Sequence, residues 1–268
     1  MGLTALALVL YTRNRGVPGA EPFFDPVTPA VALVFPALGA FLVSRRPGQA
    51  VGWLFCTAVL LAVALFADQY AAYALATSPG SLPGGLWMAW IGSWVWIPGF
   101  LAIRTLLLLL FPDGRPPSAH WTPVARLTAA VIGAMTVLAA VANLPGLDAP
   151  SAVKALPHLS GLLLAPIALA GLIARYRRSV GLERAQLRWF TVAAAAATLV
   201  PLLAAAFALL TPSAFASPWL RYLYQGAGVV SLLALPAATV VALLRHRLYD
   251  LDAYDLDTLV DRSLLYAG

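Results

Sequence analysis

Long runs of apolar residues, separated by short polar segments, dominate the pattern of this chain. A helix of about 20 apolar residues crosses the hydrocarbon core of a bilayer. We expect seven such spans, at residues 27–43, 50–76, 86–111, 124–144, 156–174, 189–211 and 222–244. Because a bare backbone cannot face lipid, these runs are expected to be helices. The pattern therefore predicts an all-α fold, a polytopic transmembrane helix bundle.

Short turns rich in Pro, Gly and Ser, such as residues 78–85, make successive helices antiparallel neighbours. A further apolar run, Met1–Tyr11, is about half the length of a span, and we interpret it as a short N-terminal apolar helix. It lacks the basic start and the small-residue cleavage site of a secretory signal. We expect three regions: 1–26 with the short run, 27–244 with seven full spans, and an acidic linker at 245–268.

Composition supports lipid as the solvent of this fold. The chain is 61% hydrophobic and only 10% charged, whereas soluble domains carry about 25% charged residues. One cysteine, Cys56, excludes an internal disulfide and a cysteine-rich metal site. The net charge of +6 comes from basic residues placed between apolar runs. This placement fits membrane topology better than a nucleic-acid partner.

The basic residues also predict an orientation. One set of loops and helix ends holds Arg45, Arg46, Arg115, Arg126, Arg175, Arg177, Arg178, Arg184, Arg188, Arg245, Arg247 and Arg262, and the opposite set holds Arg13, Arg15, Lys154 and Arg221. The richer set belongs in the cytoplasm. We therefore expect a multi-pass protein of the bacterial plasma membrane with a cytoplasmic C-terminus. The N-terminus lies outside with seven spans, and inside if Met1–Tyr11 belongs to an eighth.

Ionisable residues inside the spans are few. Asp68 lies toward the outer end of one span, and Arg104 toward the inner end of the next, at depths about 15 Å apart. We expect Arg104 to extend to the inner interface. Asp68 either reaches outer water or makes a polar contact in a pocket. The histidines, His120, His158 and His246, do not predict a catalytic base or a metal site.

Aromatic residues gather at the predicted outer depth beside Asp68. Tyr70 and Tyr73 end one span, and Trp87, Trp90 and Trp94 follow at the spacing of one helix face. One interpretation is an interfacial belt, because Trp and Tyr favour that depth. The other is the wall of a small apolar pocket with Asp68 near its floor. As a ligand-binding hypothesis we take these six residues together.

Five of the expected spans contain an internal proline: Pro36, Pro98, Pro166, Pro201 and Pro236. A proline removes one backbone donor and bends its helix. The bends are either tolerated kinks or hinges between two packings of the bundle.

The C-terminal segment changes character abruptly. Its charged residues include Arg245, Arg247, Asp250, Asp252, Asp261 and Arg262, and the unit Tyr-Asp-Leu-Asp occurs twice, five residues apart. It lacks the glycine and the final glutamate of a calcium-binding loop. We interpret it as a solvated signal linker along the basic inner surface. Ser263 is placed to cap a further helix, so we expect the natural chain to continue.

Four motifs resemble the membrane region of bacterial two-component sensor histidine kinases, in the multi-span type frequent in actinobacteria. They are Gly52-Trp53-Leu54-Phe55, Phe111-Pro112-Asp113-Gly114-Arg115, Glu183–Phe190, and Arg245–Asp252 with Asp261–Tyr266. The chain departs from the family in its short first run and its doubled linker unit. It also ends before any phosphoacceptor helix or ATP-binding domain, so no catalytic residue carries over.

The resemblance implies that this chain is a signal-input region and that its own residues do not carry out catalysis. It implies no cofactor in this chain, with ATP and Mg only if a kinase domain follows. The implied partners are membrane lipid, a second copy in a homodimer, a cytoplasmic kinase portion and its response regulator. The alternative is a small-molecule transporter or permease, which would want more polar mid-membrane residues. A third hypothesis is a scaffold that binds partners through the linker.

Overall fold

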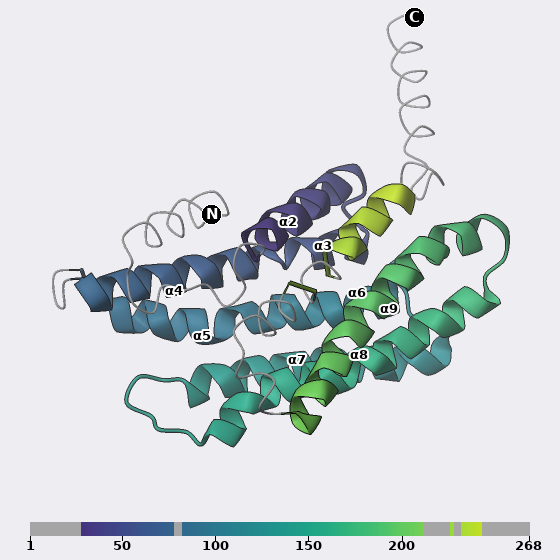
Figure 1. Ribbon diagram of the computed structural model, residues 1–268. Coiled ribbons are helices and arrows are strands. Elements are labelled where there is room, and N and C mark those ends of the chain that lie inside the picture. Colours follow the sequence, from purple (N-terminus) through teal and green to yellow (C-terminus); the bar gives the residue numbers. More distant parts are fainter. Residues whose placement is uncertain (1–27, 78–81, 212–225, 228–231, 243–268) are drawn as a thin grey trace, which may run out of the picture.

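The computed structural model describes residues 28–77, 82–211, 226–227 and 232–242, and these ranges hold helices and turns but no strand (Figure 1). The helices are α2 (Thr28–Arg45), α3 (Ala50–Cys56), α4 (Val59–Thr77), α5 (Gly85–Leu101), α6 (Leu107–Leu110), α7 (Thr122–Ala142), α8 (Ser151–Arg178) and α9 (Gly181–Leu210). A π-helical turn, Ala102–Leu106, joins α5 to α6, and a 3₁₀ turn, Ala119–Trp121, precedes α7. The all-α prediction is confirmed for these residues.

Five helical segments are long and apolar enough to cross a membrane. They are Ala50–Ala76, Gly85–Leu110, Ala119–Ala142, Ser151–Arg178 and Glu183–Phe207. Two shorter apolar helices, Val31–Arg45 and Leu232–Ala242, lie where we expected the first and last spans. The chain is therefore a helical membrane protein with five such segments in its described part. The short run Met1–Tyr11 lies outside the described residues.

Several helices differ from the predicted spans at their boundaries. The helix α8 covers Ser151–Arg178 and α9 starts at Gly181, so both run past the apolar segments into arginine-rich sequence. Arginine, glutamate and glutamine are good helix formers, and hydrogen bonding continues where the apolar pattern stops. The expected span at 50–76 is interrupted between α3 and α4, where the backbone turns at residues 57–58.

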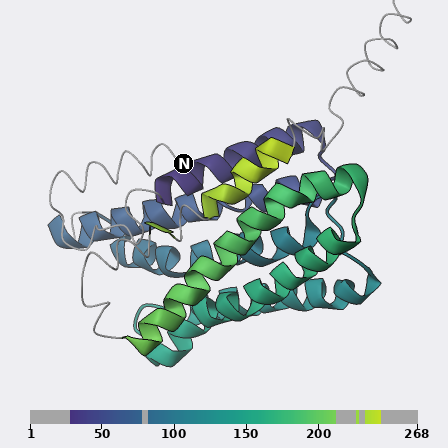
Figure 2. The ribbon, with the colours of Figure 1, turned by 45° about the vertical axis from the view of Figure 1, so that its right-hand side comes forward.

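The helices form an antiparallel bundle whose turns gather at two ends (Figures 1 and 2). The most extensive pairing is between α4 and α5, and α9 crosses α8 obliquely. In both views the helix Leu232–Ala242 lies beside α2. One large core joins them, and it includes Phe35, Phe55 and Leu235.

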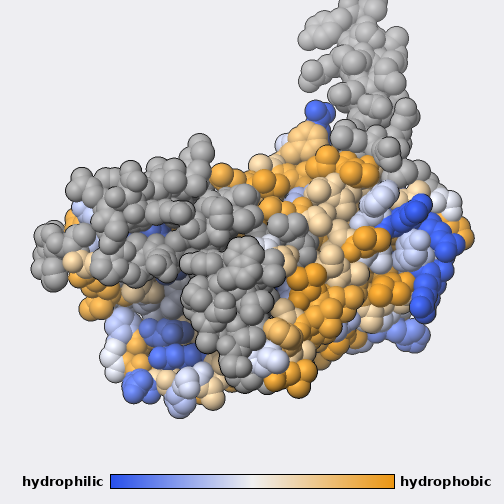
Figure 3. All heavy atoms as spheres, in the orientation of Figure 1, coloured by the Kyte–Doolittle hydropathy of each residue, from blue (hydrophilic) through white to orange (hydrophobic). Residues whose placement is uncertain are grey.

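The face of the bundle seen in Figure 3 is apolar between more polar ends. Figure 3 shows hydrophobic side chains across the middle of this face and hydrophilic ones near its extremities. Large apolar side chains are exposed there, including Leu163 at 70% and Leu203 at 66%. Water would solvate such a surface poorly, whereas lipid chains solvate it well.

Candidate functional site: an aromatic end and an arginine clamp

The aromatic end comprises the six predicted ligand-binding residues: Asp68, Tyr70 and Tyr73 on α4, and Trp87, Trp90 and Trp94 on α5. The three tryptophans form a continuous stack along one face of α5. The ring centroids of Trp87 and Trp90 are 5.8 Å apart and those of Trp90 and Trp94 are 5.5 Å apart. The shared helix face inferred from their spacing is thus present.

This tryptophan face packs against α7 rather than against the tyrosines of α4. Trp90 Nε1 donates a hydrogen bond of 2.7 Å to the carbonyl oxygen of Ala140 on α7. Trp94 packs against a small apolar core that includes Ile132, and its Nε1 is buried without a hydrogen-bond partner among the described residues. Trp87 is 57% exposed and ends the stack at the surface.

The residues of α4 meet different neighbours. The Asp68 carboxylate lies against Gly92, so closely that a Cβ at residue 92 would collide with it. Gly92 lies on the face of α5 turned away from the tryptophans, since 100° per residue separates successive side chains. The Tyr70 hydroxyl donates a hydrogen bond of 3.0 Å to the Pro83 carbonyl in the α4–α5 turn, and Tyr73 is half-buried. The tryptophan stack and Asp68 are therefore on opposite sides of α5.

Midway along the bundle, Arg104 compensates a break that a proline makes in α9. Pro201 has no N–H, so the carbonyl of Ala197, four residues earlier, loses its helical partner. Arg104 Nη2 donates 3.1 Å to that carbonyl oxygen, and its guanidinium carbon lies 5.2 Å from the Phe100 ring centroid. We expected Arg104 to extend to the inner interface; instead its guanidinium turns to a neighbouring helix, where the carbonyl freed by Pro201 accepts a hydrogen bond.

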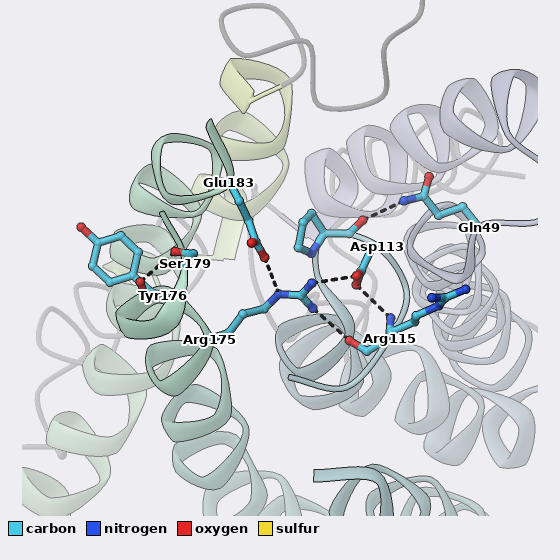
Figure 4. Close-up of polar contacts among 8 residues, drawn as sticks. Gln49, Asp113, Arg115, Arg175, Tyr176, Ser179 and Glu183 are labelled. Atoms are coloured by element: carbon cyan, nitrogen blue, oxygen red, sulfur yellow. Dashed lines mark hydrogen bonds and ion pairs between the residues drawn. The ribbon is translucent and has the colours of Figure 1, made fainter. Parts of the chain in front are cut away.

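At the opposite end from the tryptophans, Arg175 connects three chain segments, an arrangement we call the arginine clamp (Figure 4). Its Nη2 donates a hydrogen bond of 2.7 Å to Asp113 Oδ2, and its Nη1 donates one of 3.0 Å to the Arg115 carbonyl. Its Nε donates a third, of 3.2 Å, to Glu183 Oε1. The Arg175 side chain is only 12% exposed, whereas Asp113 and Glu183 are about half exposed. All three directions of the guanidinium fork are used.

The turn that presents Asp113 is built by its own sequence. The Gly114 N–H donates a hydrogen bond of 2.7 Å to the Leu110 carbonyl at the end of α6. The φ angle of Gly114 is +78°, which favours glycine at this position. The Asp113 side chain accepts the Arg115 N–H at 3.1 Å. Gln49, which precedes α3, donates 2.7 Å to the Pro112 carbonyl. The turn is thus fixed from two sides, by α3 and by α8.

Beneath the clamp, Phe111 and Phe190 stack with ring centroids 3.6 Å apart, and both are fully buried. They join the end of α6 to the start of α9 in the large core. The clamp therefore closes over an apolar contact between the same segments that it links by charge.

Arg175 also sets the charge state of Asp113. Partial burial alone would raise the pKa of this carboxyl. The hydrogen bond and the attraction from Arg175, together with the Arg115 backbone N–H, outweigh burial and hold the pKa of Asp113 below its ordinary value. Asp113 is therefore an anion at neutral pH.

Both motifs of the clamp are visible in the sequence, but their pairing is not. We singled out residues 111–115 and 183–190 as separate motifs, and Arg175 only as one of the basic residues that predict the orientation. Their partners lie 62 positions apart, and nothing in the local pattern distinguishes Arg175 from its neighbours. The available signal is charge: Asp113 and Glu183 are the acidic residues described at this arginine-rich end.

The remaining site predictions are placed as follows. The signal-linker residues Arg245, Arg247, Asp250, Asp252, Asp261 and Arg262 lie outside the described residues. Within the described part of the chain, no group of three or more His, Cys, Asp or Glu side chains is arranged to hold a metal ion. No protein-family model, no curated protein and no solved structure matches this chain.

Proposed function

We propose that this chain is the membrane-embedded signal-input region of a bacterial sensor histidine kinase. Five of its helical segments are long and apolar enough to cross a membrane, and we propose that the shorter helices at each side complete seven spans. The arginine-rich end faces the cytoplasm in this proposal, because basic flanks are retained inside. A homodimer, a cytoplasmic kinase portion and a response regulator are the proposed partners.

One observation carries the proposal. The helix Leu232–Ala242, which leads toward the C-terminal linker, contributes Leu232, Leu235 and Ala238 to the same core as Phe111 and Phe190. A change of packing at the arginine clamp therefore has a contiguous apolar route to the helix before the linker. Signal input needs such a two-state element at the membrane exit.

The test joins the full chain at Gly268 to the phosphoacceptor and ATP-binding core of a sensor kinase, and measures autophosphorylation in membranes. We expect Arg175→Ala to change the rate severalfold. Arg177→Ala is the matched control, because Arg177 is exposed and has no hydrogen bond, ion pair or ring contact among the described residues. Equal rates in the parent fusion and both variants would reject the proposal.

Orientation has its own test. We expect the bond between Arg177 and Arg178 to resist trypsin added to intact cells and to be cut in inverted membrane vesicles. Cleavage in intact cells would place the arginine-rich end outside and remove the route to a cytoplasmic kinase.

A second candidate function is a transporter, and Arg104 favours it. Arg104 lies in a π-helical turn of an apolar segment and contacts a proline-broken helix, and irregular backbone of this kind lines transport sites in membrane proteins. Chloride efflux from proteoliposomes of the full chain, abolished by Arg104→Leu, would rank this function above signal input.

A further inference from the structure

The exposed face of α9 changes from basic to apolar along a single stripe. Arg184, Arg188, Val192, Leu199, Leu203 and Phe207 are all exposed, and they follow one another at intervals of four or seven residues. Such intervals keep side chains on one helix face. The stripe therefore starts with two guanidinium groups and continues from Val192 to Phe207 as a hydrocarbon surface along about 22 Å of helix rise.

The opposite face of α9 handles its charge differently. Glu183 turns inward to Arg175, and Leu187 and Phe190 are fully buried. The acidic residue at this helix start is thus used within the protein, while the basic residues are displayed outside. This division leaves the outward stripe with positive charge that its own helix does not neutralise.

The two exposed arginines of the stripe contact aromatic rings rather than hydrogen-bond acceptors. The guanidinium carbon of Arg184 lies 5.4 Å from the Tyr176 ring centroid, and that of Arg188 lies 5.7 Å from Trp189. Neither side chain has a hydrogen bond or ion pair within the described part of the chain. A ring contact orients a guanidinium but leaves its N–H groups available.

We propose that this stripe binds an anionic phospholipid. Arg184 and Arg188 donate to the phosphodiester, for which the guanidinium fork is matched. Trp189, which is 46% exposed, lies at the headgroup level, and the acyl chain follows Val192, Leu199 and Leu203.

The apolar continuation identifies the occupant. An acidic protein docked on Arg184 and Arg188 would have no use for a hydrocarbon surface that runs on toward Phe207, whereas a lipid carries both chemistries in one molecule. Figure 3 shows the two surfaces adjoining, with hydrophilic side chains at the α8–α9 turn and hydrophobic ones along α9.

The test measures local lipid enrichment at Trp189. The full chain is reconstituted in phosphatidylcholine bilayers that contain brominated phosphatidylglycerol or brominated phosphatidylcholine, with bromine near the headgroup. The quenching due to Trp189 is the difference between the parent protein and Trp189→Phe. We expect stronger quenching by the anionic lipid, and a fall of about fivefold or more in this preference when Arg184 and Arg188 are both changed to Gln.

Two further variants make the result specific. Arg45→Gln with Arg46→Gln removes the same charge at the same end but off the stripe, and should keep the preference. Arg184→Lys with Arg188→Lys keeps the charge and should retain most of it. The proposal is overturned by equal quenching in the two lipids, by a preference that survives the Gln pair, or by its equal loss in the Lys pair.

Discussion

The two ends of this bundle are held together in different ways. At the aromatic end the contacts are short in sequence or between adjacent helices: tryptophans stack along one helix, and Trp90 reaches a backbone carbonyl of α7. At the arginine clamp one buried side chain, Arg175, joins segments 60 or more positions away as well as the next helix. The first end is held by several separate contacts, whereas the side-chain ion pairs of the second converge on a single residue.

That difference bears on where a conformational change could be controlled. Removing one ring from a stack weakens one packing contact, whereas removing the guanidinium of Arg175 removes at once three polar contacts that link the turn after α6, α8 and α9. A single-residue connection is the simpler device for switching, because one competing charge suffices to open it. The comparison predicts unequal responses to substitution at the two ends.

The largest effect is expected from Arg175→Ala. It removes three hydrogen bonds, two of them to carboxylates that are about half exposed, so we expect a loss of about 2 kcal/mol in the free energy of unfolding. Unfolding in mixed micelles measures it. Arg177→Ala, within about 0.5 kcal/mol of the parent, is the control. Arg175→Lys should recover only part of the loss, because an ammonium group cannot form the fork.

A result in which Arg175→Ala and Arg177→Ala unfold alike would show that the clamp contributes no more than an ordinary surface arginine. The contrast between the two ends would then disappear.

Between the two ends, Arg104 tests whether a single side chain also stabilises the bundle through one specific hydrogen bond. Arg104→Leu leaves the Ala197 carbonyl without a donor in an apolar setting, which we expect to cost about 1.5 kcal/mol. In a Pro201→Ala background, the restored N–H of residue 201 satisfies that carbonyl. The cost of Arg104→Leu should then fall by about 1 kcal/mol, as the coupling energy of a double-mutant cycle.

Equal costs of Arg104→Leu in the two backgrounds would mean that Arg104 stabilises the protein through its other contacts and not through the carbonyl that Pro201 frees.

A smaller effect is expected within the tryptophan stack, where two chemically identical substitutions should differ. Trp90→Phe removes the hydrogen bond to Ala140 and should cost about 1 kcal/mol. Trp94→Phe removes a buried N–H that has no partner among the described residues, so its cost should be at least about 0.5 kcal/mol lower. Thermal unfolding of the two variants side by side measures the difference. The reverse order would indicate that Trp94, not Trp90, is anchored.

The sequence predicts the structure of one end of the bundle better than that of the other. Period and composition predicted the helices and the shared face of the three tryptophans, because both follow from the 3.6-residue repeat and the length of an apolar run. They missed that this face meets α7 and that Asp68 lies against Gly92, since periodicity says which residues share a face and not what that face contacts. Whether the six residues bind a ligand stays a prediction.

The local pattern placed both segments of the arginine clamp at the same end of the bundle, but it did not pair Asp113 with Arg175. This contact needs α8 to continue past its apolar run, so that Arg175 lies beside the turn that follows α6. Apolar length predicted seven spans, and five segments in the described residues are long enough to cross a membrane, so the count of seven stays a prediction.

The smallest expected effect at neutral pH, and the most diagnostic of the clamp's chemistry, is its response to acid. The folded-state pKa of Asp113 lies below the ordinary value of about 3.9. A lowered pKa means that the carboxylate stabilises the fold fully above that ordinary value, and that this stabilisation is lost as the pH falls through the lowered one. Asp113→Asn should therefore be less stable than the parent at neutral pH, and the two should converge in unfolding midpoint below about pH 4.

Asp148→Asn, at an exposed carboxylate in the α7–α8 turn, controls for the loss of a negative charge. If the gap between parent and Asp113→Asn stays constant as the pH is lowered, the residue acts through turn geometry alone. The clamp would then be a hydrogen-bonded corner of the same kind as the Trp90 contact at the other end.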